Sequence, residues 1–145
     1  MKVLYDHQAF TIQHFGGVSK CFCELISHLP DNIDYSISCP ASNNIHLKAS
    51  NLVSRLSTSI MDRETFRTKY PYKGSSFLYE KVNDMFPFLK TTENLNKKAS
   101  VDALRGKNFD VFHPTAMDDY FIPYLSGKPF VATIHDMMPE LFPQY

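Results

Sequence analysis

The sequence lacks an excess of charge of either sign. Fifteen lysines and arginines balance fifteen aspartates and glutamates across 145 residues. Because nucleic-acid binding draws much of its affinity from basic side chains that neutralise phosphates, this balance argues against a nucleic-acid partner. Hydrophobic residues make up 43% of the chain, which is enough to form a core. We therefore expect one folded domain over residues 1–145.

Long apolar runs are also missing. No stretch approaches the roughly 20 residues that a membrane-spanning helix needs. The first apolar run, Val3–Tyr5, ends at Asp6 and is too short for the hydrophobic region of a signal peptide. The expected location is therefore cytoplasmic.

Cysteine is scarce, with three in the chain: Cys21, Cys23 and Cys39. Their number is odd, and Cys21 and Cys23 would point to different faces of a helix. These features disfavour a disulfide framework or a metal site. We expect the cysteines to be small buried apolar residues.

The first forty residues have the hydrophobic pattern of a βαβ unit. Lys2–Tyr5 is a short apolar run typical of a buried strand. Val18–Leu29 carries apolar residues at three- and four-residue steps, which predicts a helix. Ile33–Cys39 alternates apolar and polar residues and ends at a proline, which predicts a second strand. Strands joined by a helix in this way are parallel.

The middle region, 41–108, is less regular and begins with a predicted turn at 42–44. It contains three possible helical segments, at 62–67, 76–86 and 92–105. Two predicted strands follow it, at 109–113 and 129–136. The helix over 92–105 has Thr92 as a candidate N-cap, Glu93 in its first turn and Gly106 as a candidate stop. The pattern predicts an α/β fold, a Rossmann-like, open, mainly parallel sheet with helices on both faces.

Polar residues follow three of the four predicted strands where those strands end. They are Asp6 and His7, then His113 and Thr115, then His135 and Asp136. In open α/β sheets, ligands bind outside the carboxyl ends of the strands. If the strands are parallel, these side chains converge on one edge of the sheet, which is the candidate site.

Gly16 and Gly17 stand directly in front of the first predicted helix, after a stretch expected to be a loop. Glycine lets the backbone turn sharply and lets a ligand approach its amides, and a helix N-terminus suits phosphate. A tight turn without a ligand is the alternative. The pair is not part of a G-x-G-x-x-G sequence, so the usual dinucleotide fingerprint is absent.

The histidines His113 and His135 have two interpretations each: a buried, satisfied imidazole or a group that meets a ligand. The pair His135-Asp136 could indicate a metal hydrolase, but further ligands at suitable spacing are not evident, and we expect no metal. The neighbouring aromatic residues are expected to serve packing rather than to form a sugar platform. They are Tyr120, Phe121, Tyr124, Phe142 and Tyr145.

Three stretches in this order carry a resemblance: YDHQAFTIQHFGGVSKCFCELISHLP, FDVFHPT and GKPFVATIHDMMPELFP. They resemble the N-terminal half of bacterial GT-B glycosyltransferases of family four, which include enzymes of polysaccharide and lipopolysaccharide assembly. The resemblance is weak over residues 45–107, where such proteins vary. It implies that residues 1–145 are an acceptor-side Rossmann-like domain, incomplete at its C-terminal end. The donor-binding domain of the GT-B fold would be absent from this chain.

The resemblance also implies roles for residues. Gly16 and Gly17 would face the diphosphate of a nucleotide-sugar donor, and His135 would be the catalytic residue beside the transferred sugar. The remaining polar residues would line or support the cleft: Asp6, His7, His113, Thr115 and Asp136. Such enzymes typically retain anomeric configuration and often need no bound metal or other cofactor.

The partners implied are the nucleotide-sugar donor and a glycan or lipid-linked acceptor. Peripheral association with the inner face of the membrane and self-association of the chain are compatible with the resemblance. The alternative function is a stand-alone, non-catalytic α/β module that binds a ligand or partner.

Overall fold

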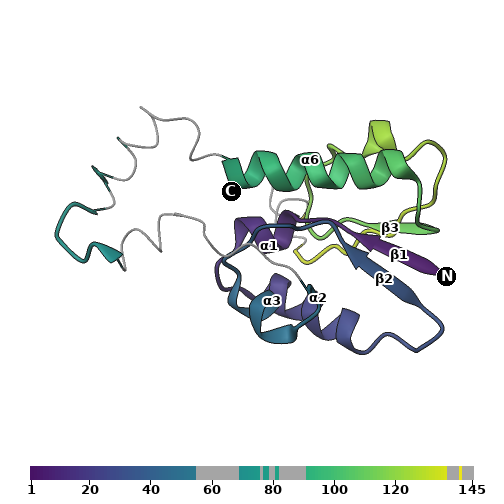
Figure 1. Cartoon of the computed structure of the whole chain (residues 1–145), viewed down its shortest axis with the longest axis horizontal. Helices are drawn as coiled ribbons and strands as arrows, with labels where there is room; N and C mark the ends of the chain where they lie inside the picture. Colours follow the sequence, from purple (N-terminus) through teal and green to yellow (C-terminus); the bar gives the residue numbers. More distant parts are fainter. Residues whose placement is uncertain (55–68, 76, 79–80, 82–90, 137–140, 142–145) are drawn as a thin grey trace.

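A computed structural model describes residues 1–54, 69–75, 77–78, 81, 91–136 and 141 (Figure 1). Within these residues, three parallel strands form one sheet in the order β2-β1-β3. The strands are β1 (Lys2–Tyr5), β2 (Asp34–Ile37) and β3 (Val111–His113). The predicted α/β fold with a Rossmann-like parallel sheet is confirmed.

The central strand β1 pairs in parallel with β2 on one side and with β3 on the other. Leu4 pairs with Ser36 of β2 and with Phe112 of β3. Because side chains alternate along a strand, β1 serves two cores. Val3 and Tyr5 pack into one apolar cluster, whereas Leu4 packs into the other.

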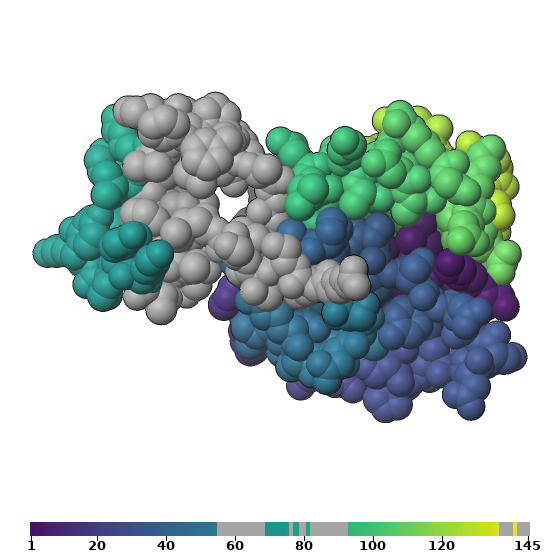
Figure 2. All heavy atoms as spheres, in the orientation of Figure 1, coloured from purple at the N-terminus to yellow at the C-terminus, as the bar shows by residue number. Residues whose placement is uncertain are grey.

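Helices cover both faces of this sheet. On one side lie α2 (Gly17–Ser27) and α3 (Ile45–Ser50), and on the other lies α6 (Thr91–Gly106). The space-filling view shows the blue surface of α2 and α3 and the green surface of α6 on opposite sides of the purple β1 (Figure 2). This two-sided cover explains why the buried residues of β1, Val3–Tyr5, form an unbroken apolar run.

Each core is built from the helix that faces it. Phe22 and Ile26 of α2 are almost fully buried with Tyr5 in the first cluster. Leu104 of α6 is fully buried with Phe112 in the second. The 3-10 helix η2 (Ile122–Tyr124) lies beside α6 and closes the second core.

Two short helices were not expected from the sequence. The stretch after β1, expected to be a loop, contains α1 (Gln8–Ile12). The segment 42–44, expected to be a simple turn, is buried and leads into α3, where the Asn44 side chain accepts a hydrogen bond from the amide of Leu47 at 2.9 Å. Both helices are much shorter than the roughly 11–18 residues over which helical periodicity can be recognised, so periodicity could not reveal them.

The predicted fourth strand over 129–136 is wrong. In this segment the structure contains a single parallel bridge between Phe112 and Phe130, and residues 131–136 are not strand. Val131 and Ile134 are exposed rather than buried. The apolar sequence suits a sheet core, but without burial of these side chains the extended pairing has little to stabilise it.

The other predicted elements differ mainly at their ends. The helix α6 begins at Thr91, so Thr92 is not its N-cap. The helix ends at Gly106, the predicted stop, and the next residue, Lys107, has a left-handed conformation with φ of 54°. The helical segment predicted at 62–67 lies outside the described residues, as does most of the one at 76–86. Cys23 and Cys39 are buried as expected, but Cys21 is exposed because it lies on the outer face of α2.

Candidate functional site

The carboxyl edge of the sheet is organised around Asp6, whose side chain is fully buried. Its Oδ1 accepts hydrogen bonds from both the amide and the hydroxyl of Thr115, at 2.8 and 2.7 Å. Its Oδ2 accepts from Gln8 Nε2 at 2.7 Å and from the Tyr120 hydroxyl at 3.1 Å. These donors satisfy a buried carboxylate, which would otherwise be costly. Asp6 therefore joins the ends of β1 and β3.

Gln8 extends this network to the loop after β3. Its Nε2 donates to the carbonyl of Asp118 at 3.0 Å, and its Oε1 accepts from the amide of Asp118 at 2.9 Å. The hydroxyl of Thr115 accepts from the amide of Ala9 at 3.0 Å. The first turn of α1 and the 115–118 loop are thus held together through polar groups.

His7 is buried on the α6 side of the same edge. Its Nδ1 lies 2.9 Å from Ser100 Oγ, which in turn lies 2.8 Å from Ser38 Oγ. Burial lowers the pKa of His7, although the charges of Asp6 and Glu93 oppose that shift. These contacts place His7 in a scaffold between β1, β2 and α6.

His113 and His135 come together around Phe22 of α2. The Phe22 ring centroid lies 5.2 Å from that of His113 and 5.5 Å from that of His135. His113 Nε2 also lies 2.8 Å from the hydroxyl of Thr133. Burial lowers the pKa of His113, the Asp6 charge opposes this shift, and His135 adds to it. His113 is buried, whereas His135 is exposed.

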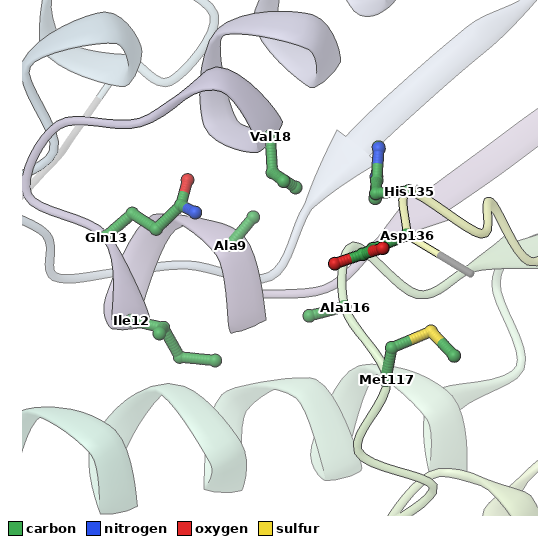
Figure 3. Close-up of a pocket in the computed structure, with 8 residues that line it drawn as sticks. All are labelled: Ala9, Ile12, Gln13, Val18, Ala116, Met117, His135 and Asp136. Atoms are coloured by element: carbon green, nitrogen blue, oxygen red, sulfur yellow. The ribbon is translucent and has the colours of Figure 1, made fainter. Parts of the chain in front are cut away.

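A pocket of about 330 Å³ opens at this edge (Figure 3). Eight residues line it: Ala9, Ile12, Gln13, Val18, Ala116, Met117, His135 and Asp136. Figure 3 shows the Asp136 carboxylate directed toward the space between Ala9 and Ala116, while the His135 ring is directed toward α2. The pocket thus collects residues from α1, α2 and the segments that follow β3.

The glycine pair has a structural role at Gly16. The side chain of Gln13 packs so closely on Gly16 that a Cβ atom there would overlap Gln13 Oε1. That oxygen accepts a hydrogen bond from the amide of Ser19 at 3.2 Å, so Gln13 caps the N-terminus of α2. At Gly17, by contrast, a Cβ atom would meet no heavy atom within 4 Å. Local packing therefore does not require a glycine at position 17.

Apart from Gly16, which packs against Gln13, the residues predicted from the sequence fall into two groups. His135 and Asp136 line the pocket, and Gly17 directly precedes the pocket residue Val18. Asp6, His7, His113 and Thr115 are buried behind this edge.

Sequence reasoning missed Gln8 and Gln13, which carry much of the polar structure at this edge. Glutamines in a short segment between a strand and a helix have no distinctive spacing. Gln8 bonds to Asp118 and Gln13 bonds to Ser19. No sequence pattern indicates either contact, because each depends on how the chain folds.

Within the described residues, no group of three or more histidine, cysteine, aspartate or glutamate side chains could hold a metal ion. The helices of the same part of the chain include none long and apolar enough to cross a membrane. Most of the aromatic residues near the edge are packed: Phe121 is buried, and Tyr120 and Tyr124 are partly buried against the second core. Phe142 and Tyr145 lie outside the described residues.

Comparisons with protein-family models, with curated proteins and with solved structures found no match to this chain. The structure itself establishes a small α/β domain with a parallel sheet. Because no related protein was found, the function has to be argued from the site.

Proposed function

We propose that this chain is the acceptor-side domain of a retaining, nucleotide-sugar-dependent glycosyltransferase of the GT-B type, acting in cell-surface polysaccharide or lipopolysaccharide synthesis. The observation that carries the proposal is the pocket at the carboxyl edge of the sheet. It brings His135 and Asp136 together with Val18, the second residue of α2. A ligand site at this edge is what a parallel α/β sheet favours.

The donor diphosphate would approach the start of α2 in this proposal. Helix N-termini carry unpaired amides and a partial positive charge, which suit phosphate oxygens. The amide of Ser19 is already bonded to Gln13, so the amide of Gly17, two residues earlier, is the better candidate. The open space around Gly17 supports this choice because a phosphate could reach the backbone there.

His135 would act on the transferred sugar. In retaining transfer, positive charge develops on the sugar ring and negative charge on the leaving phosphate. A polar group fixed beside these charges stabilises the transition state more than the ground state. The contact of the His135 ring with Phe22 would hold the imidazole in place, and Asp136 would support the same segment.

A non-catalytic binding module is the second candidate. The mainly apolar lining of the pocket favours it, because an apolar cavity with few polar groups is typical of ligand binding in general. In that case the chain would bind a ligand at the pocket without cleaving any nucleotide-sugar.

The deciding experiment uses the protein encoded by the complete reading frame that contains this chain. It is incubated with UDP-, GDP- and ADP-sugars and with glycan and lipid-linked acceptors, and nucleotide release is measured. We expect acceptor-dependent release from one donor class, with retained anomeric configuration in the product. Absence of release from every donor, together with ligand binding at the pocket, would favour the binding module.

Residues 1–145 alone give a second test. Since the proposal assigns the donor to a second domain, we expect no turnover from this segment by itself. Positioning of two reactants can be worth about 7–11 kcal/mol of barrier, and half a cleft cannot supply it. Repeated turnover by the purified segment would contradict the proposed division of roles.

A further inference from the structure

The pocket is apolar over most of its wall. Five of its eight lining residues are apolar: Ala9, Ile12, Val18, Ala116 and Met117. Two of them remain strongly exposed, Ile12 at 72% and Met117 at 68%. Large apolar side chains left open around a cavity indicate that a ligand covers them.

Two of the three polar residues of the pocket lie together on one side of it. His135 and Asp136 are consecutive, and Figure 3 shows them on the side opposite Ile12 and Gln13. Gln13, the third polar residue, already uses its side-chain oxygen to accept from Ser19. The pocket therefore has a polar side at His135 and Asp136, and apart from Gln13 the rest of its wall is apolar.

We infer that this pocket binds an amphiphile, with a hydrocarbon chain against Ile12, Ala116 and Met117 and a hydroxylated head group beside His135 and Asp136. The inference rests on the proposed function only in assigning the amphiphile the role of acceptor. A bare sugar fits less well, because it would place many hydroxyl groups against side chains that cannot hydrogen-bond them. A lipid-linked acceptor is thus favoured over a free glycan.

The size of the pocket limits how much of the chain it can hold. At about 330 Å³ it lies at the small end of the roughly 300–1,000 Å³ that ligand pockets span. The segment of chain next to the head group would enter it, and the rest would extend past the exposed Ile12 and Met117. Affinity should then rise with chain length and level off once the pocket is full.

The experiment titrates the protein with n-alkyl β-D-glucosides from butyl to decyl, each below its critical micelle concentration, with glucose as the chain-free probe. Each buried methylene should improve affinity about fourfold, until a plateau is reached. No detectable binding of the longer glucosides, or affinity independent of chain length, would overturn the inference.

Two variants locate the binding site. Ala116→Leu fills the pocket and Met117→Gln removes part of its apolar wall, so each should reduce affinity for octyl glucoside at least tenfold. Ile122→Gln is the matched control, because Ile122 is an exposed apolar residue on η2 that does not line the pocket. Circular dichroism and melting temperature verify that each variant is folded. Equal loss of affinity in the control would show non-specific adsorption and would overturn the inference.

These titrations contain no donor, so their outcome is separate from that of the proposed function. Chain-length-dependent binding without nucleotide-sugar cleavage would support the amphiphile site and refute the transferase. Cleavage of a donor with free glycans, and no effect of the alkyl chain, would refute the amphiphile site alone.

Discussion

Asp6 and Thr115 are joined twice through a single oxygen atom. Asp6 Oδ1 accepts from the amide of Thr115 at 2.8 Å and from its hydroxyl at 2.7 Å. These residues follow β1 and β3, so the pair connects the ends of two parallel strands. The loop that supplies Ala116 and Met117 to the pocket begins at this connection.

Asp6→Asn should destabilise the domain by about 1.5–3 kcal/mol, because it weakens hydrogen bonds to a buried charged group. The new amide nitrogen would face either the donor groups of Thr115 or the Nε2 donor of Gln8. Urea denaturation measures the change. Asp102→Asn, at an exposed position on α6, is the control and should stay within about 0.5 kcal/mol of wild type. Equal stability of the two variants would contradict the role assigned to Asp6.

The two neighbouring glycines should respond differently to alanine. Gly16→Ala should displace the Gln13 side chain and remove its bond to Ser19, at a cost of about 0.5–1.5 kcal/mol. Gly17→Ala, in the first turn of α2, should leave stability unchanged or raise it by about 0.4–1 kcal/mol.

A double-mutant cycle tests the cause of the Gly16 effect. In a Gln13→Ala background, Gly16→Ala should cost much less, because the side chain that it displaces is gone. If Gly16→Ala costs as much in this background as in the wild type, displacement of Gln13 is not the cause of its effect. In the complete enzyme of the proposed function, Gly17→Ala should reduce donor-dependent activity without loss of stability.

Acidification should destabilise the domain through His7 and His113. Burial lowers the pKa of each below the ordinary value of 6.5, so the unfolded chain binds protons that the folded chain does not. Stability is therefore fully present above pH 6.5 and falls as the pH drops below it, down to the folded pKa values. Urea denaturation at pH 7.5 and 5.5 should give lower stability at pH 5.5. A His113→Asn variant should show a smaller loss of stability between pH 7.5 and 5.5. A larger loss would contradict the lowered pKa assigned to His113.

The cysteines should differ in reactivity. Cys21 is exposed, whereas Cys23 and Cys39 are buried. Burial raises the pKa of both buried thiols, that of Cys39 to about 12. Since the thiolate is the reactive form, a disulfide reagent should modify one thiol rapidly in the native protein and all three after unfolding. Cys21→Ser should abolish the rapid phase. Two rapid thiols in the native protein would be inconsistent with this packing.

His135→Ala tests the proposed catalytic role in the complete enzyme. Loss of a preorganised polar contact to the transition state typically lowers kcat by roughly 10²–10³-fold, with a smaller effect on KM. His28→Ala is the matched control, since His28 is an exposed histidine that follows the last residue of α2. A lower melting temperature with normal kcat would assign His135 to packing against Phe22.

The sequence was sufficient for the elements that repeat a strong pattern. The βαβ unit of β1, α2 and β2 and the strand β3 follow from local apolar patterns, and the long helix α6 follows from the residues expected at its two ends. The polar residues after β1 and β3 could likewise be placed at one edge, because parallel strands end on the same side. Such features depend on local periodicity, which is contained in the chain itself.

Only the tertiary structure decided which polar residues reach the pocket and which support it. Asp6 and Thr115 look as available in the sequence as His135, yet they are fully buried and bonded to each other. The apolar run at 129–136 likewise leaves the sheet after Phe130. Burial and hydrogen bonding between residues about one hundred positions apart depend on how the helices and loops pack, and local sequence preferences do not contain that information.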